Sequence, residues 1–329
     1  MGPEPLLSVS NLTVQFRGER GWFDAVHDVS FSVGARETLG IVGESGSGKS
    51  VSALTLLRLH ARRTTRIPSG RISFGGEDLL AASERRMRQL RGGEIAMIFQ
   101  EPMSSLNPVL TIADQISETL VLHQGLSKAQ ARRRAIELLD LVRIPDAARR
   151  VDEYPHRLSG GMRQRVMIAI AIACQPKLLV ADEPTTALDV TIQAQILELL
   201  RDLQDELGMS VVLITHDLGV VAEFAQRVVV MYAGRVVEEA PVGALFDRPM
   251  HPYTDGLLAA IPSLDVDRRR LATIPGSIPD PAIAIPGCRF EPRCRQAQPR
   301  CRAEPPPLLE AGPRHAARCP PRVLGEVPA

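Results

Sequence analysis

Short runs of consecutive apolar residues alternate with segments of helical periodicity over the first 240 positions. The runs have the length of buried strands, and they are TLGIV at residues 38–42, KLLVA at 177–181 and SVVLIT at 210–215. Elsewhere apolar residues recur every three or four positions, as on one face of a helix; these segments are VSALTLLRL at 51–59, IADQISETLVLH at 112–123 and KAQARRRAIELLDLV at 128–142. Strands interspersed with helices predict an α/β fold.

Proline is distributed unevenly along the chain. Of the 26 prolines, 17 follow position 240, and 14 of those lie between residues 262 and 328. Such a segment cannot contain long helices or a central strand, because proline lacks a backbone N–H and fixes φ. We therefore predict a regular α/β domain at residues 1–240 and a loop-rich extension at 241–329.

The composition is that of an ordinary globular protein, with 44% hydrophobic and 23% charged residues. A net charge of +1 gives no bulk attraction to nucleic acid or to an anionic membrane. The longest apolar run, at 166–174, is far shorter than the roughly 20 residues of a membrane-spanning helix. The first residues lack the features of a signal peptide, and Gly2 before Pro3 is a weak myristoylation pattern. We expect a protein of the reducing cytoplasm, where disulfides are rare.

A glycine-rich loop joins the strand at 38–42 to the helix at 51–59. Its sequence, GESGSGKS, matches the phosphate-binding pattern G-x-x-x-x-G-K-[ST] in the required strand–loop–helix context. Backbone N–H groups of such a loop surround phosphate oxygens, its lysine reaches the β- and γ-phosphates, and its hydroxyl ligates Mg²⁺. The sequence therefore predicts a site for ATP and Mg²⁺. The predicted residues are Gly43, Glu44, Ser45, Gly46, Ser47, Gly48, Lys49 and Ser50, the last as a metal ligand.

Polar residues follow the other two strands at their carboxyl ends, the edge where open α/β sheets bind ligands. Asp182 and Glu183 come after KLLVA, and His216 follows SVVLIT. An aspartate at a strand end holds Mg²⁺ in P-loop enzymes, so Asp182 is the predicted metal ligand. Strand alternation points Glu183 elsewhere, where it can act as general base toward the attacking water. His216 is predicted to hold the γ-phosphate and to orient that water.

A second candidate anion site lies at the start of a helix. Ser159, Gly160 and Gly161 precede an apolar stretch in RLSGGMRQRVMIAIAIA. Exposed N–H groups and a serine hydroxyl at a helix N-terminus attract an anion, although a simple serine N-cap has the same sequence. One chain has no need of two sites for one γ-phosphate. The pair therefore predicts two protomers arranged head to tail, with ATP between the loop of one and the helix of the other.

Together these segments resemble the ATP-binding cassette of ABC transporters. GESGSGKS resembles the Walker A loop, LSGGM the signature motif, LLVADEP Walker B, and TALD at 186–189 the D-loop. The resemblance implies a P-loop ABC ATPase fold: a RecA-like core with a mixed sheet, an antiparallel β subdomain, and a helical subdomain at about 101–160. The arginine-rich stretch at 131–150 falls in this subdomain; its interleaved acidic residues favour a solvated face over a nucleic-acid patch.

The resemblance also assigns roles to single residues. Gln100 is implied as the Q-loop glutamine, a catalytic residue and Mg²⁺ ligand, and Asp189 as the D-loop aspartate. Phe16 is implied as the aromatic that stacks on adenine, although Trp22 and Phe23 lie close in sequence. Met162 stands where most cassettes carry glutamine, which affects one polar contact across the expected dimer.

Four of the five cysteines lie in the last 42 residues, with the spacing C-x5-C-x6-C-x17-C. They are Cys288, Cys294, Cys301 and Cys319. Four thiolates in a proline-rich segment can hold a metal, and the spacing alone excludes neither structural zinc nor an iron–sulfur cluster. Nearby arginines either balance an anionic cluster or form solvated surface; they are Arg289, Arg293, Arg295, Arg300 and Arg302. The fifth cysteine, Cys174, is expected to pack in the core.

The extension resembles that of oligopeptide/dipeptide importer ATPases in HPYTDGLLAAIP, TIPGSIPDP and GCRFEPRC. This resemblance implies a [4Fe–4S] cluster on the four cysteines, with zinc as the alternative. It implies an ATP-hydrolysing subunit at the cytoplasmic face of the membrane, paired with a second, different ATPase, two permease subunits and an external binding protein. The alternatives are a soluble ABC ATPase acting on nucleic acid or the ribosome, a non-hydrolysing ATP clamp, and an importer of nickel chelates or other peptide-like solutes.

Overall fold

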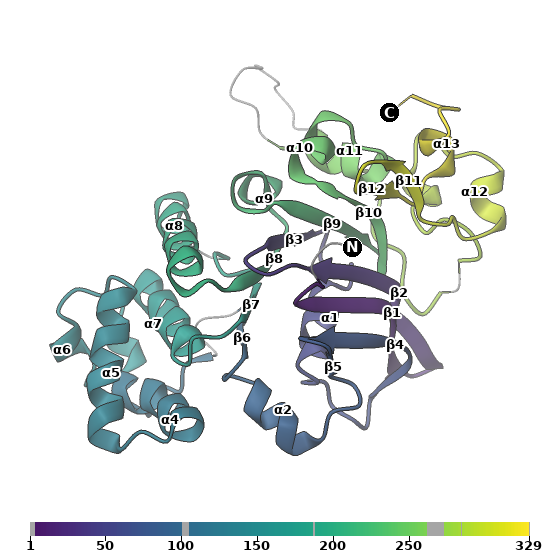
Figure 1. The fold of residues 1–329 in the computed structure, drawn as a ribbon. Coiled ribbons are helices and arrows are strands. Elements are labelled where there is room, and N and C mark those ends of the chain that lie inside the picture. Colours follow the sequence, from purple (N-terminus) through teal and green to yellow (C-terminus); the bar gives the residue numbers. More distant parts are fainter. Residues whose placement is uncertain (1–3, 101–104, 187, 262–272, 284, 329) are drawn as a thin grey trace. The chain divides into compact units, whose positions relative to one another are not determined.

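The computed structural model describes residues 4–100, 105–186, 188–261, 273–283 and 285–328 (Figure 1). The chain divides into two compact units. The first contains Met1–Gly34, Thr38–Leu80 and Leu213–Ala329, and the second contains Ala35–Glu37 and Ala81–Val212. Residues 101–104 of the expected helical subdomain, Ala187 of the TALD segment and Pro262 of the extension lie outside the described residues.

The first unit contains an antiparallel sheet of order β2-β1-β4-β5. Its strands are β1 (Leu7–Gly18), β2 (Gly21–Val33), β4 (Thr65–Phe74) and β5 (Glu77–Asp78). β1 pairs with β2 on one side and β4 on the other, and irregular register after Val9 keeps its apolar side chains Leu12 and Val14 buried. This sheet corresponds to the antiparallel β subdomain that the sequence implies.

A mixed group of strands follows in the same unit, in the order β11-β12-β10-β9-β3. β3 and β9 are parallel, whereas β9–β10, β10–β12 and β12–β11 are antiparallel. The strands are β3 (Thr38–Val42), β9 (Arg227–Tyr232), β10 (Arg235–Pro241), β11 (Leu309–Gly312) and β12 (His315–Ala317). The extension thus adds two short strands beside β10, which is compatible with its many prolines.

Helices of the first unit are short. They are α1 (Lys49–Leu56), α9 (Leu218–Phe224), α10 (Val242–Asp247), α11 (Pro252–Ala259), η2 (Glu291–Arg293), α12 (Arg300–Ala303) and α13 (Pro320–Val323). An aromatic core joins the extension to the strands: Tyr232 of β9, Tyr253 of α11 and Phe290 have ring centroids 4.7–5.4 Å apart, and all three are buried. Cys288 and Cys294 pack against this core.

The second unit contains β6 (Ile95–Ile98) and β7 (Leu178–Asp182), which pair in parallel, and the start of β8 (Ser210–Thr215). Its helices are α2 (Glu84–Leu90), α4 (Ile112–Gln124), α5 (Lys128–Leu141), α6 (Ala147–Arg150), η1 (Pro155–Arg157), α7 (Gly160–Ile172) and α8 (Val190–Leu207). α4, α5 and α7 lie side by side (Figure 1). Capping boxes begin α4 at Thr111 and α5 at Ser127, which explains why these helices start where they do.

The sequence predicted the strands at 38–42 and 210–215 with their observed bounds, and the α/β class is confirmed. The first helix begins at Lys49 rather than Val51, because Gly48 adopts φ = 100° and ends the loop immediately before it. The boundary near residue 240 stays a prediction.

Candidate nucleotide-binding site

The loop between β3 and α1 requires glycine at two of its positions. Gly43 has φ = 152°, and a Cβ there would lie 2.2 Å from the carbonyl oxygen of Met231. Gly48, with φ = 100°, is the N-cap of α1, and a Cβ there would lie 3.2 Å from the carbonyl oxygen of Ala25. The loop is therefore wrapped tightly between β3 and the neighbouring backbone, and it ends at the N-terminus of an eight-residue helix, where an anion is favoured.

Lys49 turns back across this loop. Its Nζ donates to the carbonyl oxygen of Gly43 at 2.6 Å and to that of Glu44 at 3.0 Å. The hydroxyl oxygen of Ser47 is buried without a hydrogen-bond partner among the described residues. A buried orphaned hydroxyl in a native structure calls for a partner, and a phosphate oxygen has the matching acceptor chemistry. The loop therefore fits a phosphate group, and the binding roles of residues 43–50 stay a prediction.

Asp182 and Glu183 lie at the end of β7 in the second unit. Asp182 is the last residue of the strand and is buried, whereas Glu183 has a left-handed backbone with φ = 47°. Because β7 ends at Asp182, the prediction that strand alternation orients Glu183 was wrong. The left-handed backbone at Glu183 sets the direction of its side chain instead. A non-glycine residue in this region is strained, and such strain is common at functional sites.

The structure brings Gln100 and Glu183 together. Gln100 Nε2 donates to Glu183 Oε2 at 3.0 Å, and Thr186 Oγ1 donates to the same oxygen at 2.8 Å. These donors fix the orientation of the carboxylate, and they leave the amide oxygen of Gln100 as an acceptor for a hard cation. Sequence reasoning missed Thr186, whose only signal was its position three residues after Glu183.

Ser159 is the N-cap of α7, and its hydroxyl oxygen accepts the N–H of Met162 at 3.3 Å. Ser159 therefore caps α7, and its hydroxyl keeps its own proton as a donor for an anion, so the predicted anion site stays a prediction. A Cβ on Gly161 would lie 3.0 Å from Ile192 Cγ2, so this glycine lets α7 approach α8 closely. The Asp189 side chain caps α8 by accepting a hydrogen bond from the Ile192 N–H at 2.9 Å.

His216 and Phe16 both belong to the first unit. His216 is exposed directly after β8, and Asp217 beside it caps α9 by accepting the N–H groups of Gly219 and Val220. The Phe16 ring contacts two other rings edge-on, Phe23 at 6.4 Å and His60 at 5.3 Å between centroids. The guanidinium of Arg66 lies 4.5 Å above the Trp22 ring, so this second candidate aromatic is covered on one face.

The four C-terminal cysteines line one cavity of about 240 Å³ in the first unit. The Cys288 N–H donates to the carbonyl oxygen of Cys301 at 2.7 Å, and a Cβ on Gly287 would lie 2.1 Å from that oxygen. Burial raises the pKa of the Cys288 thiol to about 11 and raises those of Cys294 and Cys319. Among the described residues, no three or more His, Cys, Asp or Glu side chains form a group suited to a metal ion.

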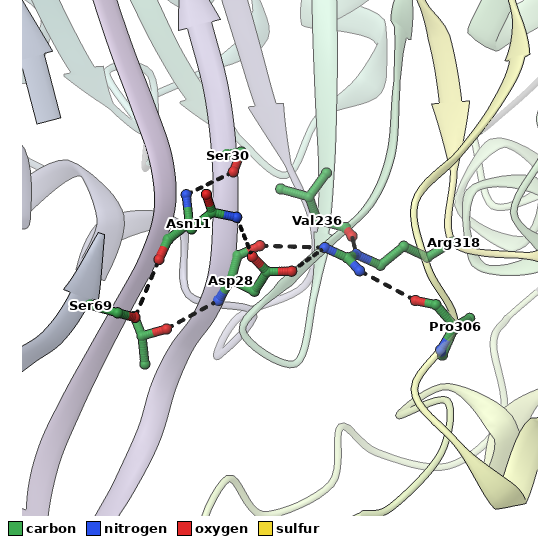
Figure 2. Close-up of polar contacts among 8 residues, drawn as sticks. Asn11, Asp28, Ser30, Ser69, Val236, Pro306 and Arg318 are labelled. Atoms are coloured by element: carbon green, nitrogen blue, oxygen red, sulfur yellow. Dashed lines mark hydrogen bonds and ion pairs between the residues drawn. The ribbon is translucent and has the colours of Figure 1, made fainter. Parts of the chain in front are cut away.

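Arginines adjacent to three of these cysteines contact the rest of the first unit. Arg289 donates to the carbonyl oxygen of Ala233, and Arg293 pairs with Glu44 of the phosphate-binding loop. Arg318, next to Cys319, donates to Asp28 of β2 at 2.8 Å and to the carbonyl oxygens of Val236 and Pro306 (Figure 2). The solvated-surface interpretation does not hold for Arg289 and Arg293.

Comparison with known proteins gives the family. The sequence model of the family described as ABC transporter matches residues 26–186, and that of the oligopeptide/dipeptide transporter C-terminal region matches residues 237–301. A protein of Brucella abortus, provisionally named a peptide import ATP-binding protein, is 64% identical over 322 residues, which cover 98% of this chain and 96% of that protein. The chain belongs to the ABC transporter family. A Brucella melitensis protein of the same provisional name is 53% identical over 330 residues, covering 97% of this chain and 98% of that protein.

Solved ABC cassettes share the fold of this ABC ATPase. The dimeric cassette MJ0796, solved with ADP and Pi, is 29% identical with a TM-score of 0.64, covering 72% of this chain and 98% of that one. The Clostridium perfringens protein cbiO1, part of the ABC transporter complex cbiONQ, is 28% identical with the same TM-score, covering 74% of this chain and 92% of that one. In the described parts of the chain, no helix is both long and apolar enough to cross a bilayer.

Proposed function

We propose that this chain is the ATP-hydrolysing subunit of an importer of oligopeptides or dipeptides. The observation that carries the proposal is one chain with an intact phosphate-binding loop, a glutamate held by two donors, and a peptide-transporter C-terminal region. The peptide substrate is supported by the names of the Brucella relatives. We assign residues 1–240 to the ABC domain, with a helical subdomain at about 101–160, and residues 241–329 to the extension.

In the proposed reaction, N–H groups of the loop bind the β- and γ-phosphates of ATP, and Lys49 exchanges its carbonyl contacts for phosphate oxygens. Ser50, Asp182 and Gln100 supply the hydroxyl, carboxylate and amide oxygens that Mg²⁺ prefers. When bound, Mg²⁺ neutralises charge that develops on the phosphates. Glu183 accepts the proton of the attacking water, with its carboxylate held by Gln100 and Thr186.

The remaining predicted residues take the roles that the family implies. Phe16 stacks on adenine and His216 holds the γ-phosphate. The helix start at Ser159, together with Gly160, Gly161 and Met162, closes over ATP bound to a partner subunit, and Asp189 lies in the segment next to it. Closure of this dimer moves the helical subdomain and switches the permease.

For partners, we propose a second and different ATPase subunit, two membrane-spanning permease subunits and an external substrate-binding protein. The dimeric state of a related cassette supports the ATPase pair. The chain would then act peripherally at the cytoplasmic face of the cell membrane, attached through the permease.

We also propose that Cys288, Cys294, Cys301 and Cys319 hold a [4Fe–4S] cluster. All four line one cavity, and soft thiolates are the ligands that such clusters take. The four cysteines would supply one thiolate each to such a cluster, and structural zinc is the alternative that the same four thiolates could hold. The role of the cluster would be to hold the extension together.

The importer is tested by affinity purification of the tagged chain from detergent-solubilised native membranes. Recovery of two multi-spanning proteins, a second cassette and a peptide-binding protein supports the proposal. A nickel-chelate-binding protein in place of the peptide-binding one would change the substrate class. Recovery only from the soluble fraction, with ribosomes or nucleic acid attached, would overturn transport while leaving ATP hydrolysis in place.

The cluster is tested by iron and acid-labile sulfide analysis of anaerobically purified protein. We expect about four irons and four sulfides per chain in the wild-type protein. Cys288→Ser should lose most of the iron and the sulfide. The control Cys174→Ser should lose neither, since Cys174 lies outside the cavity. Zinc without iron or sulfide in the wild-type protein would refute the cluster.

A further inference from the structure

The phosphate-binding loop contains a carboxylate, that of Glu44. Glu44 is the second residue of the loop, and its side chain is 31% exposed. A negative charge beside the site repels the phosphates of ATP, because Coulomb energies near a protein surface remain appreciable over several ångströms. Some other group must offset this charge if ATP is to bind tightly.

The extension supplies that group from 249 residues away. Arg293 Nη1 donates to both carboxylate oxygens of Glu44, at 3.2 Å and 3.0 Å. The Arg293 side chain is only 6% exposed. Its other nitrogens donate to the carbonyl oxygens of Pro275 at 2.9 Å and Ile274 at 3.3 Å, so the guanidinium is held in place from the opposite side.

Aromatic residues complete the arrangement around Glu44. The hydroxyl of Tyr253 accepts the backbone N–H of Glu44 at 2.8 Å, and the hydroxyl of Tyr232 accepts from Arg293 Nη1 at 3.4 Å. Both tyrosines are almost fully buried. The backbone and the side chain of Glu44 are therefore both fixed by groups that lie outside the loop.

We propose that Arg293 is a positioning residue for ATP binding: it neutralises Glu44 and holds the loop ready for phosphate. The inference rests on the proposed ATP site at residues 43–50 and adds to it a dependence on the extension. Removal of Arg293 leaves an unpaired carboxylate beside the phosphates, whereas removal of both charges leaves no such carboxylate in the loop.

The test measures the Kd of a fluorescent ATP analogue for the purified full-length chain. For Arg293→Ala we expect a Kd about tenfold higher at low salt, with a smaller difference at high salt because exposed charges are screened. The double variant Arg293→Ala with Glu44→Gln should return to within about threefold of wild type. Rescue by removal of a second group separates charge neutralisation from a general structural role.

Arg318→Ala is the matched control, because the Arg318–Asp28 pair also ties the extension to the strands but does not touch the loop (Figure 2). Its Kd should equal that of wild type. Arg293→Lys keeps the charge and should lose less affinity than Arg293→Ala. If the melting curve shows that Arg293→Ala does not fold, Arg293→Lys replaces it as the test variant.

The proposal is overturned by wild-type affinity in Arg293→Ala, by a double variant as weak as Arg293→Ala, or by an equal loss in Arg318→Ala. The underlying ATP site has its own control: if Lys49→Ala binds the analogue as well as wild type, the proposed function fails first. A Lys49-dependent site that is insensitive to Arg293 would refute only the role of Arg293.

Discussion

The extension should lose stability below pH 6.5 because of one buried histidine. His251 is 1% exposed, and burial lowers its pKa from 6.5 to about 4. Its Nδ1 accepts the N–H of Tyr253 at 3.1 Å and so caps α11, a role that only an unprotonated Nδ1 can fill. Glu238 and Arg322 are the charged groups that act on the ring, the first raising its pKa and the second lowering it.

The sign follows from linkage. The unfolded chain binds the proton at pH 6.5 while the folded chain resists it until about pH 4, so protonation favours unfolding. The stabilising effect of the neutral ring is complete above pH 6.5 and is lost as pH falls toward 4. Between pH 7 and pH 5 the loss amounts to about 2 kcal/mol, from about 1.4 kcal/mol per pKa unit.

Urea unfolding of wild type and His251→Asn at pH 7 and pH 5 measures this loss. Asparagine offers an oxygen for the cap without titrating in this range. We expect the wild type to lose about 2 kcal/mol more than the variant, and the exposed control His156→Asn to behave as wild type. Equal losses in wild type and His251→Asn would show that His251 protonation does not govern the acid sensitivity.

Two further predictions concern the chemistry and the cysteine cavity. Glu183→Gln should bind ATP normally but lower the hydrolysis rate at least about 100-fold, because the general base is lost; turnover near that of wild type would refute its assignment. Gly287→Ala should lower the iron content of anaerobically purified protein, because its Cβ would meet the Cys301 carbonyl oxygen at 2.1 Å. Gly243→Ala, where a Cβ meets nothing within 4 Å, is the control and should keep its iron.

Local features of this protein could be read from the sequence, and long-range pairs could not. A strand, a glycine-rich loop and a helix start lie within about a dozen residues at 38–50, so the sequence predicted this strand–loop–helix unit, although it placed the helix start at Val51 rather than Lys49. The pairs Arg293–Glu44 and Arg318–Asp28 join residues 249 and 290 positions apart. A single sequence has no periodicity that links such positions. The arginines beside the cysteines were noticed, but their partners depend on how the extension folds back.

The extension is attached to the rest of its unit through individual side-chain contacts, so we expect single residues of the extension to have local effects. Its prolines exclude long helices, so polar side chains provide contacts that regular backbone bonding would otherwise supply. Glu238 of β10 is fully buried and accepts the N–H groups of Met250 and His251 as well as His315 Nε2. A segment attached by such discrete contacts acts on the nucleotide site only where a contact reaches it. Arg293 and Tyr253 both contact Glu44, so changes at these residues of the extension should alter ATP binding, whereas Arg318→Ala should affect stability alone.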